Sequence, residues 1–95
     1  MSTVRQALTD ALRDRALDAH ELSYLVSIRE KDVAEHLEHI ERSLARTGER
    51  LVVEPAVCQE CGFGFKKREK KTRPSRCPKC QSERITAPRF RVEAR

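Results

Sequence analysis

Cys58-Gln59-Glu60-Cys61 and Cys77-Pro78-Lys79-Cys80 decide the fold of the second half of this 95-residue chain. Fifteen residues separate the two Cys-x-x-Cys pairs, which together use every cysteine of the sequence. This spacing is typical of two knuckles, joined by a hairpin, whose four thiolates converge on one metal ion. We therefore predict one structural Zn²⁺ per chain, with a closed ligand set formed by Cys58, Cys61, Cys77 and Cys80.

Three other uses of the cysteines are less favoured by the sequence. Residues 1–6 contain no apolar signal segment, so we expect a cytoplasmic, reducing location in which a disulfide framework is disfavoured. Rubredoxin-type iron uses similar knuckles, but only Phe63, Phe65 and Phe90 could supply an aromatic shell. A redox dithiol would need a βαβ unit beside one pair, and none is predicted.

Charge is distributed unevenly along the chain, whose formal net charge is +5. Residues 1–57 carry eight Lys/Arg against eleven Asp/Glu, whereas residues 58–95 carry twelve against four. Four thiolates and a divalent ion would lower the net charge of the second part from +8 to about +6. Contact with phosphate groups is therefore expected in the metal-binding half.

Apolar periodicity predicts two helices before residue 27. The first begins behind the capping residues Ser2 and Thr3. Its apolar residues recur at helical spacing and are Val4, Ala7, Leu8, Ala11 and Leu12. A capping box of Asp18 and Glu21 opens a second, short helix that ends near Val26.

A third, longer helix is predicted from Glu30 to a stop at Thr47-Gly48. Its apolar face is formed by Val33, Leu37, Ile40 and Leu44. A short helix, a tight turn and a longer helix are typical of a helix-turn-helix, although plain three-helix packing has the same periodicity.

Two strands are predicted after these helices, one over residues 51–57 and one over residues 85–92. Both knuckles lie between them. We therefore predict an α+β fold, a winged helix-turn-helix with a four-cysteine zinc ribbon inserted at the wing. Its parts are residues 1–57 for the helix-turn-helix and first wing strand, residues 58–84 for the zinc ribbon, and residues 85–95 for the return strand.

The chain resembles a family of small archaeal proteins, predicted transcriptional regulators, in which a winged helix-turn-helix is fused to a rubredoxin-like zinc ribbon. The resemblance covers nearly the whole length and rests on Glu21-Leu22-Ser23 and residues 32–40 in the helical half. It rests equally on Cys58-x-x-Cys61-Gly62-Phe63, on Cys77-Pro78-Lys79-Cys80-x-Ser82 and on residues 88–92. The resemblance implies zinc at the four cysteines and a role in transcription.

The third helix does not have the charge of a typical recognition helix. Residues 30–46 contain five acids, Glu30, Asp32, Glu35, Glu38 and Glu41, against three cations, Lys31, Arg42 and Arg46. Burying such a face against the phosphates of a duplex is repulsive unless the acids point elsewhere or accept from cytosine. We therefore expect this helix not to dock conventionally in the major groove.

Residues 66–76 hold the densest cationic cluster, with seven cations and one acid. A charge run is often a solvated tip, but this one lies between metal knuckles and is followed by further arginines. We predict that double-stranded DNA is contacted by Lys66, Lys67, Arg68, Lys70, Lys71, Arg73, Arg76, Arg89 and Arg91. RNA binding through the ribbon is an alternative.

The remaining features predict no chemistry. Phe63 and Phe65 are expected to pack the ribbon core rather than stack on bases. His36 and His39, with Glu35, form a surface group more readily than a second metal site. No catalytic motif is recognised, so we expect no enzyme.

The alternative function is an adaptor whose acidic helical surface docks a protein partner, while the ribbon contacts nucleic acid or that partner. A homodimer formed through the first helix is a further expectation, although no long heptad repeat specifies it. No apolar run approaches the length of a membrane span, so no membrane partner is expected.

Overall fold

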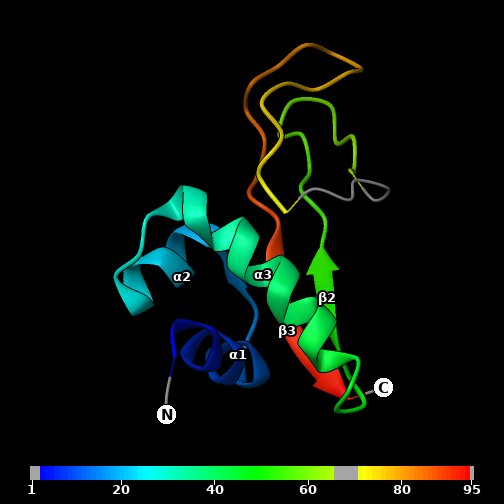
Figure 1. Cartoon of the computed structure of the whole chain (residues 1–95). Coiled ribbons are helices and arrows are strands. Elements are labelled where there is room, and N and C mark those ends of the chain that lie inside the picture. The colour runs from blue at the N-terminus through cyan, green and yellow to red at the C-terminus, as the bar shows by residue number, and fades with distance from the viewer. Residues whose placement is uncertain (1–2, 66–70, 95) are drawn as a thin grey trace.

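The computed structural model describes residues 3–65 and 71–94 of the chain (Figure 1). Its helices are α1 (Val4–Asp14), α2 (Ala19–Val26) and α3 (Glu30–Leu44). Its strands are β1 (Leu17–Asp18), β2 (Glu49–Glu54) and β3 (Arg89–Ala94). The result is a small α+β fold, with three helices packed on a three-stranded antiparallel sheet and a ribbon extending from β2 and β3. No helix in the described residues is both long and apolar enough to span a bilayer.

The predicted helices are confirmed, and local side chains explain their ends. The Thr3 hydroxyl accepts from the Gln6 amide at 3.1 Å at the start of α1. At the start of α2, Asp18 accepts from the Glu21 amide while Glu21 accepts from the Asp18 amide, at 2.8 and 3.0 Å, which completes the predicted capping box. The helix ends at Ser27, whose left-handed φ of 56° turns the chain toward α3.

The sheet has the order β1-β3-β2, with β3 in the centre. Phe90 of β3 lies opposite both Leu17 of β1 and Val53 of β2. The sequence pattern did not predict β1, because two residues are too few to show alternation. The prediction that the last strand starts at residue 85 is wrong. Ile85 instead pairs with Cys58 inside the ribbon, and β3 begins directly after Pro88, which has no amide proton to donate.

Two separate hydrophobic cores hold the chain. The larger one joins one face of α3 and of α1 to the inner face of the sheet, and Phe90 at its centre is fully buried. Its buried members are Leu8, Leu12, Leu17, Leu22, Val33, Leu37, Ile40, Leu44, Leu51, Phe90 and Val92. The smaller core lies in the ribbon and, among residues 55–65 and 71–88, contains four buried residues, of which two are cysteines. The ribbon therefore has little apolar burial to stabilise it.

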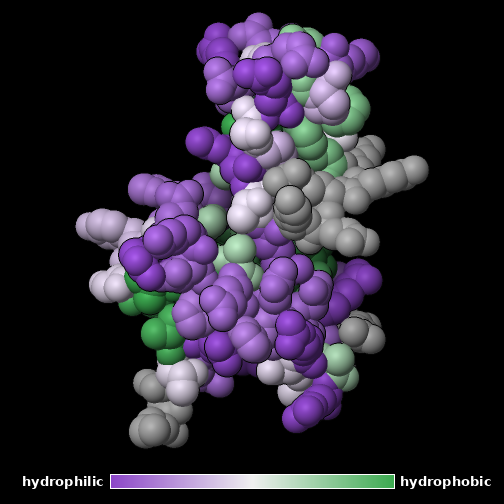
Figure 2. Space-filling view, turned by 45° about the horizontal axis from the view of Figure 1, so that its top comes forward, coloured by the Kyte–Doolittle hydropathy of each residue, from purple (hydrophilic) through white to green (hydrophobic). Residues whose placement is uncertain are grey.

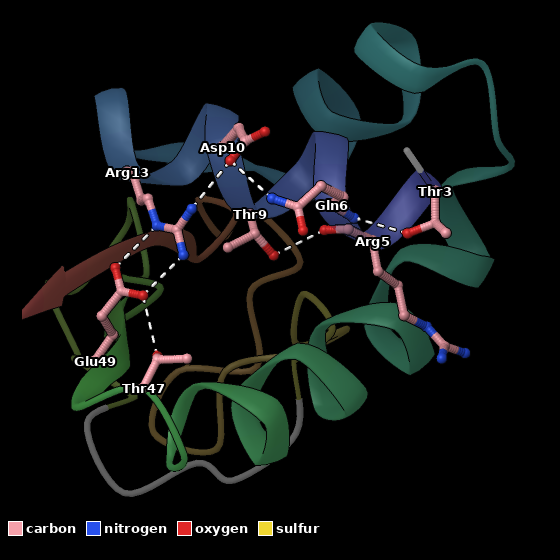
Figure 3. A network of polar contacts seen from close by, with 8 residues as sticks. All are labelled: Thr3, Arg5, Gln6, Thr9, Asp10, Arg13, Thr47 and Glu49. Atoms are coloured by element: carbon pink, nitrogen blue, oxygen red, sulfur yellow. Dashed lines mark hydrogen bonds and ion pairs between the residues drawn. The ribbon is translucent and has the colours of Figure 1, made fainter. Parts of the chain in front are cut away.

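A polar network ties the end of α1 to the beginning of β2 (Figure 3). The Arg13 guanidinium donates to both carboxylate oxygens of Glu49, from Nε at 2.9 Å and from Nη2 at 2.8 Å, and also to Asp10. Thr47 donates to the same Glu49 carboxylate at 3.1 Å. These hydrogen bonds, chiefly that from Arg13, lower the pKa of Glu49. The network thus fixes where β2 starts, and with it the strand that leads to the first knuckle.

Candidate metal centre

The ribbon is built from short backbone contacts around the two knuckles. The Phe65 amide donates to the Ala56 carbonyl at 3.0 Å, and the Thr86 amide donates to the Val57 carbonyl at 2.9 Å. Phe63 and Phe65 pack against the small core, with ring centroids 5.0 Å apart in an edge-to-face arrangement. The prediction that these two rings pack the ribbon core is therefore confirmed.

The two knuckles have the same backbone geometry. In the first, the Gly62 amide donates to the Cys58 carbonyl and the Cys58 amide donates to the Phe63 carbonyl, both at 2.9 Å. In the second, the Gln81 amide donates to the Cys77 carbonyl at 2.9 Å and the Cys77 amide to the Ser82 carbonyl at 2.8 Å. The residue after each second cysteine is left-handed, with φ of 79° at Gly62 and 66° at Gln81. Each knuckle thereby turns both of its sulfurs toward the other knuckle.

The four sulfurs form a compact group, with all Sγ atoms within 4.8 Å of one another. Across the knuckles, Cys58 Sγ lies 3.5 Å from Cys80 Sγ, and Cys61 Sγ lies 3.6 Å from Cys77 Sγ. A tetrahedral zinc with Zn–S bonds of ~2.3 Å separates its sulfurs by roughly 3.8 Å. The donor set, its distances and its closure therefore fit one structural Zn²⁺.

Backbone amides also direct the charge on these sulfurs. Hydrogen bonding from the backbone at Cys61, more than any other interaction, lowers the pKa of Cys58 to about 7. The amide of Ser82 acts in the same sense on Cys80, but burial and the three neighbouring sulfurs outweigh it and raise the pKa of Cys80 to about 12. Four thiols this close cannot all ionise alone, because like charges repel. A bound dication removes that repulsion and takes the place of the remaining thiol protons.

Comparison with known proteins agrees with this geometry. A family model described as PF0610-like, N-terminal matches residues 3–52, and one described as the PF0610 rubredoxin-like zinc beta-ribbon domain matches residues 55–95. The chain belongs to the PF0610-like family. The solution NMR structure of protein PF0610 from Pyrococcus furiosus is similar to it, with 36% sequence identity and a TM-score of 0.82. The similarity covers 97% of this chain and 90% of that chain. No curated protein matches this chain.

The family assignment identifies the second half as a rubredoxin-like zinc ribbon, and the predicted ligands Cys58, Cys61, Cys77 and Cys80 are the four clustered cysteines. The ribbon holds one structural zinc ion. The two family models divide the chain between residues 52 and 55, although β3 pairs with β2 across that division. The division into residues 1–57, 58–84 and 85–95 stays a prediction.

The cations predicted to contact nucleic acid lie in different settings. Lys66, Lys67, Arg68 and Lys70 fall outside the described residues. Arg73 and Arg76 are exposed on the ribbon. On the sheet, Arg89 donates to the Ala16 carbonyl at 3.0 Å, while Arg91 pairs with Glu93, which also pairs with Arg50. The sheet arginines are therefore partly engaged within the protein.

Lys71 differs from the other predicted cations because it is buried. Its side chain is 8% exposed, and its Nζ lies 3.0 Å from the Glu41 carboxylate on α3. A buried lysine needs such a partner, since an unpaired ammonium is costly away from water. Lys71 thus holds the returning arm of the ribbon against α3, and we do not count it among the groups open to a ligand.

Sequence reasoning missed two features of this region. Gln81 occupies the left-handed position that Gly62 occupies in the first knuckle, and comparing the two knuckles residue by residue could have revealed it. The Glu41–Lys71 contact had no sequence signal, because the two residues are thirty positions apart and both sit in charged runs. Among the described residues, the four cysteines form the one group of at least three metal-ligand residues, and the acid and histidines at positions 35, 36 and 39 do not form another.

Replacing Cys77 with serine is expected to unfold the ribbon and leave the helical half largely folded. Cys77 is fully buried and supplies one of four ligands, whereas the larger core shares no residue with the smaller one. Removal of a structural zinc takes on the order of 10 kcal/mol from the module that it holds. The dispersed amide signals of the ribbon should disappear from NMR spectra, while those of α1–α3 remain. Retention of one zinc per chain, measured by elemental analysis, would contradict the assignment.

Substitutions at Gly62 and Gln81, the left-handed residues of the two knuckles, should change zinc affinity by different amounts. A Cβ at Gly62 would meet no atom within 4 Å, so Gly62→Ala adds only the left-handed strain, about 1 kcal/mol. Because folding and zinc binding are coupled, zinc affinity should fall roughly fivefold. Gln81→Gly relieves similar backbone strain, but glycine loses more conformational entropy on folding, and the two effects nearly cancel. The zinc affinity of this variant should therefore stay within about twofold of the wild type. Competition with a chelator measures both affinities, and equal decreases would refute the matched geometry.

Proposed function

We propose that the protein is a small DNA-binding transcription regulator with no catalytic role, in which the zinc ribbon is a structural arm that contacts phosphate groups. In this proposal the helical half is a winged helix-turn-helix, and the ribbon occupies the place of the wing tip. The element order α1-β1-α2-α3-β2-β3 and the sheet order β1-β3-β2 support it, because winged helices are connected in this way. Connectivity does not decide how the chain meets DNA, and the distribution of charge therefore carries that part of the proposal.

The charges on α3 favour DNA binding more than the sequence suggested. Two of its five acids pair with charged basic side chains: Glu41 lies 3.0 Å from Lys71, and Asp32 lies 2.9 Å from Arg29. A third, Glu30, lies 3.6 Å from His20, which carries a positive charge only when it is protonated. These contacts are the observation that carries the proposal, because they reduce the repulsion that a duplex would meet at this helix.

The exposed face of α3 is then close to neutral. Four further charged residues of α3 are exposed, and their two positive and two negative charges sum to zero: Lys31, Glu35, Glu38 and Arg42. A neutral face neither attracts nor strongly repels a phosphate backbone. The attraction must therefore come from the basic half of the chain. Its exposed cations among the described residues include Arg73, Arg76 and Lys79, and residues 66–70 add four cations and one acid to the sequence.

The cationic cluster of residues 66–76, which the sequence predicts as a loop between the knuckles, is called the loop below. Neutralising part of this loop is expected to flatten the salt dependence of DNA binding. Replacing Lys66, Lys67 and Arg68 with glutamine, and retaining Lys71 as the anchor on Glu41, should preserve zinc content and fold. The slope of log affinity against log salt should become less steep, by roughly 0.9 for each phosphate contact that the substitutions remove on duplex DNA. Fluorescence anisotropy over a salt series measures this slope for the zinc-loaded protein.

A matched control removes the same charge from the helical half through Arg5→Gln, Arg15→Gln and Arg46→Gln. Its slope should stay near that of the wild type, because net charge changes equally while the loop is intact. Weak, salt-independent binding by the wild-type protein would refute DNA binding. Equal slopes for the wild type and the loop variant would show that the loop is only a solvated tip.

A protein-interaction adaptor is the second candidate, and an exposed apolar group on α2 favours it. Tyr24 is 86% exposed and Leu25 is 51% exposed, beside a groove of about 540 Å³ that Leu17 and Arg15 also line. Exposed aromatic side chains are frequent anchors of protein interfaces.

A pull-down from lysate with and without nuclease tests the adaptor. Tyr24→Ala removes the exposed ring, and Val57→Ala is the control, because Val57 is an exposed apolar residue of the ribbon. Partners that survive nuclease and are absent with Tyr24→Ala, but present with Val57→Ala, would support the adaptor. Partners that all disappear with nuclease would favour binding through nucleic acid.

A further inference from the structure

A groove of about 340 Å³ separates α3 from the returning arm of the ribbon. The groove is lined by Glu30, Lys31 and Ala34 of α3, by residues 71–73 of the ribbon arm, and by Ala19 at the start of α2. The surface narrows between the ribbon and the helical half, as Figure 2 shows. Two parts of the chain that are far apart in sequence therefore create one concave surface.

The cations of this groove are open to a ligand. Lys31 and Arg73 are exposed on opposite sides, and neither forms an ion pair with another described residue. Of the acids nearby, Glu41 is paired with Lys71, whereas Glu30 lines the groove and lies 3.6 Å from His20, a side chain that is charged only when protonated. The groove is also lined by two small side chains, those of Ala19 and Ala34. The groove thus offers two positive charges to one anionic chain.

We propose that this groove binds the phosphodiester backbone of duplex DNA, with Lys31 and Arg73 contacting phosphate groups from opposite sides. The inference rests on the proposed DNA-binding function and adds the place where the backbone lies. The Glu41–Lys71 contact, which anchors the ribbon arm, also matters for this groove. By fixing residues 71–73 against α3, that contact sets the width of the groove.

The test compares salt slopes of zinc-loaded variants on one duplex of mixed sequence. Lys31→Gln with Arg73→Gln removes both cations. The slope of log affinity against log salt is then expected to become less steep by roughly 1.8, or 0.9 for each phosphate contact. Arg15→Gln with Arg46→Gln is the control, since it removes two exposed charges outside the groove. A third variant, Ala34→Leu, narrows the groove without changing charge and should also lower the slope.

The outcomes separate this inference from the function on which it rests. A lower slope in both groove variants, but not in the control, supports the groove. If both groove variants keep the wild-type salt slope, the groove is not a phosphate-binding site, although DNA binding stands. The same conclusion follows if the slopes of the groove pair and the control pair become less steep by equal amounts. A wild-type protein that does not bind duplex DNA overturns both. Zinc content and circular dichroism of each variant confirm that every comparison is made between folded proteins.

Discussion

Convergence of four cysteine sulfurs on one ion is the constraint on which the ribbon depends. Within the described part of the ribbon the core has four buried residues, of which two are ligands, and so small an apolar core stabilises little by itself. A structural zinc supplies on the order of 10 kcal/mol to such a module. The metal also relieves the repulsion among thiolates whose mutual distances are all within 4.8 Å. Folding of the ribbon and binding of zinc are therefore one process.

The position of the ribbon depends on two attachments of different kinds. The first is made by the backbone, because the ribbon leaves from β2 and returns into β3, and these strands pair along their whole lengths. The second is a side-chain contact, in which Lys71 reaches Glu41 on α3. A hinge at the strand ends alone would allow the ribbon to tilt. The lysine contact resists tilting toward or away from α3, and so couples the metal-bound half to the helical half.

Sequence patterns predicted those parts of the fold that depend on neighbours along the chain. The capping box of Asp18 and Glu21, the apolar face of α3 and the four ligands all follow from short-range spacing. The two-residue strand β1 was not predicted, because it exists only through its pairing with β3. The groove was not predictable for the same reason. Lys31 and Arg73 become neighbours only when the ribbon arm packs on α3.

Charge pairing changes how the acidic helix should be understood. A count over residues 30–46 gives a negative segment, and a negative segment should avoid a duplex. The structure divides those acids by position: Asp32 and Glu41 pair with charged basic side chains and Glu30 lies beside a histidine, while Glu35 and Glu38 are exposed, each four residues from a cation of α3. One of the pairing cations, Lys71, comes from the basic ribbon. In the proposed complex the basic half would therefore act twice, by attracting phosphate groups and by reducing the repulsion from the helix beside which they would lie.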